Sequence, residues 1–293
     1  MLKYQDKIID KNRRTERFAF GLISAFSFII VLILIVILSF IFINGFKAIS
    51  WDFLTKMPEE GMTKGGILPA IVGTLCLIAG SIVFAFPIGV MSGIFINEYV
   101  PDNALKRFIQ MMTNNLGGIP SIVFGLFGMS LFVNTLGFGD SILAGSLTLG
   151  LMVLPIIIRT TEEALKGVDD SFRMGSIALG ATKWKTTRRV VMPIAMPNII
   201  TGLILSIGRV SGETAPILFT VAVYFLPQLP HSIFEQVMAL PYHLYVITTS
   251  GTNVELSRGI AYGTALVLIM LVLICNLLAN ALRSYLQKKV KMH

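Results

Sequence analysis

Arg209 and Glu213 are two opposite charges inside a long apolar run of the chain, 198–226. Such a run is long enough to cross a bilayer as a helix, which takes about 20 residues. An ionised side chain at the bilayer centre costs about 2.5–3.5 kcal/mol, and charges at that depth usually face a bundle interior or a water-filled pathway. The spacing also permits an ion pair that neutralises itself on one helix face. We interpret the pair as a transport site, with the simple ion pair as the alternative.

The residues around this pair predict a break in the helix. The stretch 208–216 reads Gly-Arg-Val-Ser-Gly-Glu-Thr-Ala-Pro. Two glycines and a proline so close together are unfavourable for an uninterrupted helix. Irregular backbone at membrane depth is tolerated where it lines a cavity. We therefore expect Gly212 and Thr214 to belong to the same site.

The composition is that of a multi-pass membrane protein. Hydrophobic residues make up 54% of the 293 residues and charged residues 14%, and the mean hydropathy is +0.78. A soluble domain carries about 25% charged residues. The first apolar run exceeds the apolar region of a cleaved signal peptide, about 7–15 residues, so we interpret it as a retained anchor. The predicted spans are 18–43, 67–96, 108–133, 141–160, 195–225 and 259–283.

Basic residues are distributed unevenly along the chain, whose net charge is +8. With the N-terminus in the cytoplasm, 19 of the 24 basic residues fall on or next to the cytoplasmic side: six in the N-terminal tail, two at 106–107, seven within 159–189 and four in the C-terminal tail. This asymmetry follows the positive-inside rule. It predicts an all-α membrane protein with six transmembrane helices and both termini cytoplasmic, in the plasma or inner membrane. The basic charge sets the orientation of the chain in the lipid membrane and indicates no nucleic-acid partner.

The segments outside the spans complete the predicted organisation. Small residues are frequent in spans two to five, which predicts closely packed helices. The second outer loop carries few charges, so we expect it to pack on the membrane surface or against a partner. The predicted segments are a cytoplasmic N-terminal segment 1–17, an extracytoplasmic loop 44–66, a cytoplasmic loop 159–193, an extracytoplasmic loop 226–258 and a cytoplasmic tail 284–293.

The cytoplasmic loop 159–193 has the pattern of two short helices joined by a turn. Asp169, Asp170 and Ser171 are typical of a helix start, and the stretch 180–182, Gly-Ala-Thr, is typical of a stop. A basic amphipathic stretch follows and ends at Pro193. A solvated connector and a segment that docks into a groove on a partner are both compatible with this pattern.

Motifs for nucleotide or metal chemistry are absent from the sequence. No Gly-x-x-x-x-Gly-Lys-Ser/Thr loop, metal-ligand cluster, nucleophile elbow or close carboxylate pair is present, and Cys76 and Cys275 match no metal or disulfide spacing. We expect no enzyme activity, no metal and no cofactor bound by this chain. Active transport would then take its energy from an ion gradient or from another subunit.

The loop resembles the cytoplasmic coupling loop of ABC-importer permeases. The resemblance is carried by the stretch 180–184, Gly-Ala-Thr-Lys-Trp, with Pro193 thirteen residues after the glycine. In that family the loop docks on the ATPase subunit. The signature glutamate of the loop is missing, since Met174 stands at its position. The resemblance implies that the docking residues are Phe172, Met174, Ile177, Gly180, Ala181, Thr182 and Trp184.

Three further stretches resemble phosphate-specific permeases of the PstA type, with the PstC-type sister subunit as the near alternative. The first is 73–99, with its Gly-Thr, Pro, Gly and Glu-Tyr positions. The second is 118–128, and the third is Arg209 with the Gly-Glu-Thr-Ala-Pro run 212–216. The resemblance implies a type I ABC-importer bundle with its permease core at 67–283. It also implies a sister permease in a heterodimer, a pair of ATPase subunits that use ATP and Mg²⁺, and an extracytoplasmic phosphate-binding protein.

The resemblance gives the charged pair a substrate, inorganic phosphate. Arginine offers a planar fork of donors that matches phosphate oxygens, and Glu213 accepts a hydrogen bond from a phosphate that still carries a proton. Arg159 either joins this site or anchors the end of its helix as a positive-inside residue. A permease for another oxyanion, an ion-coupled secondary transporter and a non-transporting scaffold are the alternatives. A secondary transporter more often shows two repeated halves, which this sequence lacks.

Overall fold

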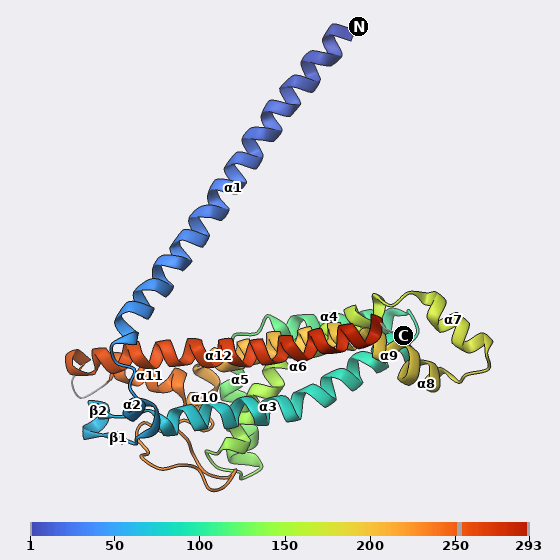
Figure 1. The fold of residues 1–293 in the computed structure, drawn as a ribbon. Coiled ribbons are helices and arrows are strands. Elements are labelled where there is room, and N and C mark those ends of the chain that lie inside the picture. The colour runs from blue at the N-terminus through green and yellow to red at the C-terminus, as the bar shows by residue number, and fades with distance from the viewer. Residues whose placement is uncertain (1, 251–253, 292–293) are drawn as a thin grey trace.

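The computed structural model describes residues 2–250 and 254–291, and almost all of them lie in helices. α1 (Leu2–Phe46) contains the first predicted span and leaves the bundle at a wide angle (Figure 1). Side chains along 19–40 are exposed, as expected of a lipid-facing helix. Its C-terminal end packs on α12 (Val254–Lys291), where Gly45 lies against the Tyr262 backbone and the Phe40 and Tyr262 rings meet edge to face at 5.6 Å.

A small ordered unit follows α1. It consists of α2 (Trp51–Thr55), β1 (Pro58–Glu59), the 3₁₀ turn η1 (Glu60–Met62) and β2 (Lys64–Gly65). The strands are antiparallel, with Pro58 opposite Gly65. Phe53 is buried and lies against Gly263 of α12, so the first outer loop is fixed to the bundle.

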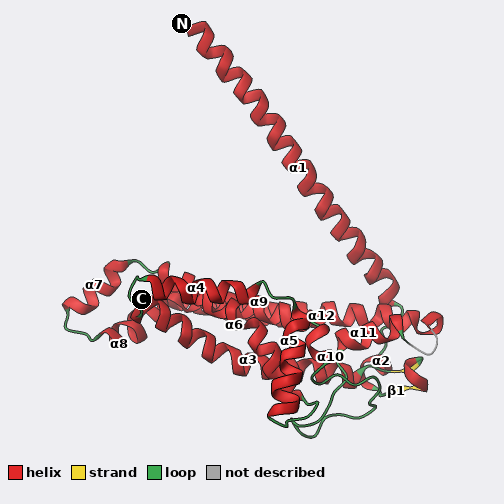
Figure 2. Cartoon of the chain, turned by 180° about the vertical axis from the view of Figure 1, so that it is seen from behind, coloured by secondary structure: helices red, strands yellow, loops and turns green. Residues whose placement is uncertain are grey.

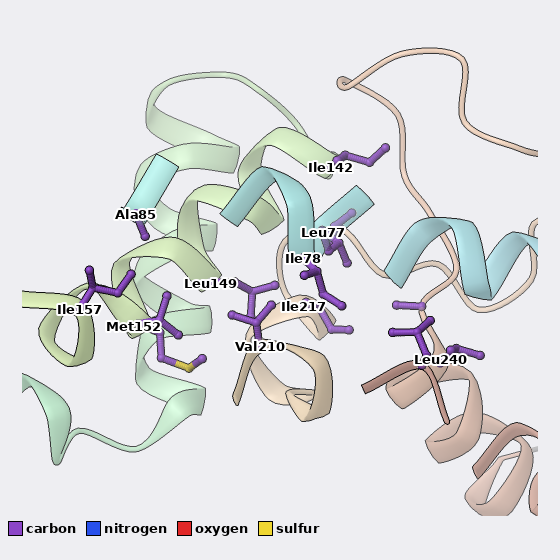
Figure 3. Packing of buried hydrophobic residues seen from close by; sticks show 14 of the residues in the cluster. Leu77, Ile78, Ala85, Ile142, Leu149, Met152, Ile157, Val210, Ile217 and Leu240 are labelled. Atoms are coloured by element: carbon purple, nitrogen blue, oxygen red, sulfur yellow. The ribbon is translucent and has the colours of Figure 1, made fainter. Parts of the chain in front are cut away.

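The core is built from α3 (Leu68–Ile94), α6 (Ile142–Lys166), α9 (Met192–Gly212) and α12. Glycines let these helices approach closely, as predicted: Gly89 lies against Ile157 of α6, and Gly202 lies against Thr160. Buried apolar side chains fill the space between the helices (Figure 3). Those labelled in the figure are Leu77, Ile78, Ala85, Ile142, Leu149, Met152, Ile157, Val210, Ile217 and Leu240.

The third predicted span is bent. The structure divides it into α4 (Ala104–Gly117) and α5 (Ser121–Gly128), which continues as the π-helical turn η3 (Met129–Thr135), and the two parts are bent by 97°. Pro120 has no N–H to continue a helix and restricts the residue before it. Among the described residues, five helices are long and apolar enough to span a membrane, or six if this bent pair is one span.

The fifth predicted span is displaced along the sequence. Helix begins much earlier, in the basic stretch, with α8 (Lys183–Thr186) and the π-helical turn η4 (Thr187–Val191), and runs on as α9 to Gly212. A short helix, α10 (Ala215–Leu218), follows the break. The expected break around Gly212 is therefore present, and the helix that is long and apolar enough to span a membrane ends there, well before residue 225.

The second outer loop was predicted to pack on the membrane surface or against a partner, and part of this prediction is wrong. Residues 237–240 are buried in the chain's own core, and Val237 forms a bridge with Ala222. The backbone N–H of Leu240 donates to Thr74 Oγ1 of α3 at 2.8 Å. α11 (Leu240–Thr249) then packs along α12. This loop folds inward because it supplies apolar side chains and a backbone donor to the bundle.

The two ends of the bundle carry different elements. α7 (Asp170–Ala178), α8 and the C-terminal end of α12 lie at one end, and α2, the strand pair and α11 lie at the other (Figures 1 and 2). The predicted coupling loop and the predicted outer loops are thus at opposite ends, although the orientation of the termini in the membrane stays a prediction.

Candidate functional site

Arg209 and Glu213 lie at the end of α9, where the helix stops. Arg209 Nε and Glu213 Oε1 are 3.6 Å apart, and the side chains are 34% and 18% exposed. Arg209 Nε is buried and makes no hydrogen bond to any described residue. The two charges therefore face each other at a distance longer than a hydrogen bond, which leaves donor and acceptor capacity for a third group.

The backbone leaves the helical conformation at Glu213. This residue has extended dihedral angles, φ −79° and ψ 130°, and Thr214 starts α10 with Pro216 in its first turn. A Cβ at Gly212 would meet none of the described atoms within 4 Å, so the backbone borders open space there. The structure thus brings together four of the predicted pathway residues, Arg209, Gly212, Glu213 and Thr214.

The inner side of this site is almost closed. Glu213, Ser211 and Thr74 border a cavity of about 10 Å³ whose other walls are apolar. That volume holds about one water molecule. An oxyanion cannot enter it, so a substrate would have to contact Arg209 and Glu213 from their exposed side.

Arg159 lies elsewhere, on α6. Its Nε donates to Glu163 Oε1 at 3.0 Å and its Nη1 to Asn114 Oδ1 of α4 at 3.2 Å, in a polar pocket of about 170 Å³. The residue of α6 that borders the Glu213 cavity is Leu149. Arg159 is ten positions after Leu149 in the helix, about 15 Å along the axis. The structure does not bring Arg159 to the charged pair.

The predicted docking segment has the expected helix–turn–helix form. Asp169 caps α7 by accepting from the backbone N–H of Ser171 at 2.8 Å, and Thr182 caps α8. Gly180, between them, has φ +81°, a conformation that costs glycine little. The apolar side chains of the segment are at least half exposed: Phe172 50%, Met174 68%, Ile177 51%, Leu179 91% and Trp184 57%. This exposed apolar surface is free to dock on a partner.

Sequence reasoning missed the role of Arg173 in this segment. Its side chain forms an ion pair with Glu98 at 2.9 Å, and both side chains are largely buried. The sequence indicated Glu98 only as part of the stretch 73–99, which resembles phosphate permeases. The two residues are 75 positions apart, and no periodicity or spacing in the sequence connects them.

The sequence matches known transport proteins over most of its length. The family model described as binding-protein-dependent transport system inner membrane component matches residues 85–292. The probable ABC transporter permease protein YqgI of Bacillus subtilis is 35% identical over 291 residues, which cover 95% of this chain and 99% of that protein. The phosphate transport system permease protein PstA of Mycobacterium leprae is 41% identical over 266 residues, 88% of this chain and 85% of that protein.

The fold is also similar to a solved structure. The structure is that of a bacterial alginate ABC transporter in complex with an alginate pentasaccharide-bound periplasmic protein. The matched chain gives a TM-score of 0.63 at 16% identity, with 96% of both chains covered. The predicted helical bundle of the type I ABC-importer permeases and the multi-pass location in the plasma membrane are confirmed. The chain belongs to the family of inner membrane components of binding-protein-dependent transport systems, as a permease of the PstA type.

Proposed function

We propose that this chain is the membrane permease subunit of an ATP-driven importer that moves inorganic phosphate into the cell. The observation that carries the proposal is the charged pair Arg209–Glu213, separated by 3.6 Å at a break in α9. The PstA proteins of Mycobacterium leprae, at 41% identity, and Xylella fastidiosa, at 34%, are phosphate transport system permeases, which supports phosphate as the substrate.

Arg209 and Glu213 select phosphate by complementary contacts. The guanidinium donates to two phosphate oxygens and stays charged at any relevant pH. Near neutral pH phosphate retains a proton, which it donates to the Glu213 carboxylate. Fully ionised sulfate has no such proton and is repelled by the carboxylate, so the repulsive contact supplies the discrimination. Gly212 and Thr214 keep the backbone open beside the bound anion.

Arg159 has a separate role in this proposal. Its contacts with Glu163 and with Asn114 of α4 join two helices, about 15 Å along α6 from Leu149, the α6 residue that borders the Glu213 cavity. These contacts favour an anchoring role over direct contact with the same phosphate ion.

The proposed assembly follows from the docking segment and the family. The exposed apolar side chains of α7 and α8 enter a groove on an ATPase subunit, where burial contributes about 25 cal/mol per Å² of apolar surface. A pair of these ATPase subunits hydrolyses ATP with Mg²⁺, and this chain binds no cofactor and catalyses no reaction. A sister permease completes a heterodimer, and an extracytoplasmic phosphate-binding protein delivers the substrate. The cytoplasmic side carries α7, α8 and both termini.

Phosphate uptake by charge-neutral variants tests the proposal. In proteoliposomes that hold the full complex, Glu213→Gln and Arg209→Gln should each lower uptake while the complex still assembles. The matched control is the Asp52–Lys56 pair, which has the same spacing, lies at 2.6 Å and is exposed; Asp52→Asn should transport at the wild-type rate. Wild-type uptake in both pair variants would reject the site.

Competition and copurification test the substrate and the energy source. Arsenate, which keeps a proton near neutral pH as phosphate does, should compete with phosphate, whereas sulfate should compete poorly. Effective competition by sulfate would instead indicate a permease for other oxyanions. An ATPase subunit should copurify with this chain, and uptake that continues without that subunit would identify an ion-coupled transporter.

A further inference from the structure

Arg173 attaches the docking helix α7 to the transmembrane helices. Its Nη2 and Nε donate to the two carboxylate oxygens of Glu98, at 2.9 and 3.4 Å. The same guanidinium donates to the carbonyl oxygens of Leu165 and Val168, both at 2.8 Å, and to Asp170 at 3.0 Å. The Arg173 side chain is 17% exposed and that of Glu98 is 8% exposed. One side chain thus joins α7, the end of α3 and the end of α6.

Polar contacts carry this attachment, because α7 itself, all of which is described, has no buried residue. On the other side of the Gly180 turn, Lys183 Nζ lies 5.4 Å from the centroid of the Tyr99 ring. Glu98 and Tyr99 are neighbours in η2 (Phe95–Tyr99), the π-helical turn that ends α3. Residues on both sides of the Gly180 turn, Arg173 and Lys183, therefore contact η2. Such π-helical turns are frequent at functional sites.

α3 connects this turn to the candidate substrate site. Thr74, Leu77 and Ile78 of α3 line the small cavity that Glu213 borders. Thr74 and Ile94, the last residue of α3, are 20 positions apart, about 30 Å along the helix axis. The continuous segment α3–η2 thus contacts the docking segment at one end and lines the cavity beside Glu213 at the other.

We propose that Glu98 and Arg173 are positioning residues that transmit the movement of α7 to α3, so that displacement of the docking segment reaches the site at Glu213. The proposal rests on the proposed function, since it assumes that α7 moves with an ATPase. A two-point contact between a guanidinium and a carboxylate fixes orientation as well as distance. Glutamine at position 98 keeps the shape but loses the charge, so α7 would move without moving α3.

Distances between two spin labels test the connection between α7 and α3, and this test requires no substrate. With Cys76 and Cys275 replaced by alanine, spin labels are placed at Ala178→Cys on α7 and Met91→Cys on α3, both exposed positions. In the full complex the wild-type background should give one narrow distance distribution with and without nucleotide. In the Glu98→Gln variant, the distances measured with nucleotide bound should no longer form one narrow distribution. A distribution as narrow as in the unmodified background would overturn the proposal, whether or not phosphate is transported.

The ratio of phosphate imported to ATP hydrolysed gives the functional readout. In Glu98→Gln and Arg173→Gln we expect this ratio to fall roughly five- to tenfold, within the usual range of coupling between sites, while the ATPase subunit stays bound. Asp102→Asn is the matched control, because Asp102 is paired with Lys106 at the same end of the bundle but is 91% exposed; its ratio should stay unchanged. A ratio that stays at the wild-type value in both test variants would overturn the coupling role. Failure of the proposed function has a different signature, the absence of phosphate import in the wild-type complex.

Discussion

His243, in α11, is a buried histidine that makes no hydrogen bond to any described residue, and its titration should be measurable. The side chain is 2% exposed, and neither ring nitrogen has a hydrogen-bond partner in the described part of the chain. Burial lowers the pKa of His243 from 6.5 to about 4, because the charged imidazolium would lose its hydration. The ring is therefore neutral in the folded protein at any pH well above 4.

This pKa shift sets the sign and size of a pH effect on stability. Between pH 6.5 and 4 the unfolded chain binds a proton at His243 and the folded chain does not, so stability falls as the pH falls through this window. A shift of one pKa unit corresponds to about 1.4 kcal/mol. The free energy of unfolding should therefore be lower by about 2 kcal/mol at pH 5 than at pH 8, and by about 3 kcal/mol at pH 4.

Denaturant unfolding in detergent between pH 4 and 8 measures this effect. His243→Leu removes the titrating group and leaves no buried donor unpaired. Between pH 8 and pH 5 the free energy of unfolding of this variant should therefore fall by about 2 kcal/mol less than that of the wild type. His231→Leu is the control, since His231 is exposed, and it should follow the wild-type pH dependence. The reasoning is refuted if His243→Leu keeps the wild-type slope, or if His231→Leu flattens the slope as much.

Two glycine substitutions test the packing of the outer segment and the docking turn. A Cβ at Gly73 would collide with the carbonyl oxygen of Met238, so Gly73→Ala should lower the free energy of unfolding by about 1–3 kcal/mol. Gly259→Ala, where a Cβ meets none of the described atoms, should change it little in the same denaturation assay. Gly180→Val should insert normally and keep the membrane spans, but hydrolyse ATP without import, because a β-branched residue is strained at φ +81°. Normal phosphate import by an assembled Gly180→Val complex would contradict the docking role of the turn.

The features that sequence predicted well depend on neighbouring residues. The break after Gly212 follows from two glycines and a proline within a few positions, and the turn at Gly180 follows from a residue that tolerates a positive φ. The start of α7 follows from Asp169, whose side chain caps the helix. In each case the chemistry that decides the conformation lies within one or two helical turns of the residue concerned.

The features that sequence missed depend on distant contacts. Pro120 disfavours a continuous helix, but the 97° angle between α4 and α5 depends on how the two helices pack on other helices. The inward fold of residues 237–240 depends on Thr74, which lies 166 positions from Leu240. Hydropathy alone predicts that this segment is an outer loop. The sequence does not show that Thr74 of the bundle accepts a hydrogen bond from its backbone.

The structure helps to decide between the two interpretations of Arg209 and Glu213. The two side chains are only partly exposed, and at a separation of 3.6 Å Arg209 Nε makes no hydrogen bond among the described residues. A self-sufficient ion pair at such a site would be expected to satisfy its buried donor by a direct hydrogen bond. The observed pair does not. A bound oxyanion would accept from the guanidinium and donate to the carboxylate, and so would satisfy both groups. This comparison favours a substrate site over a self-neutralising pair.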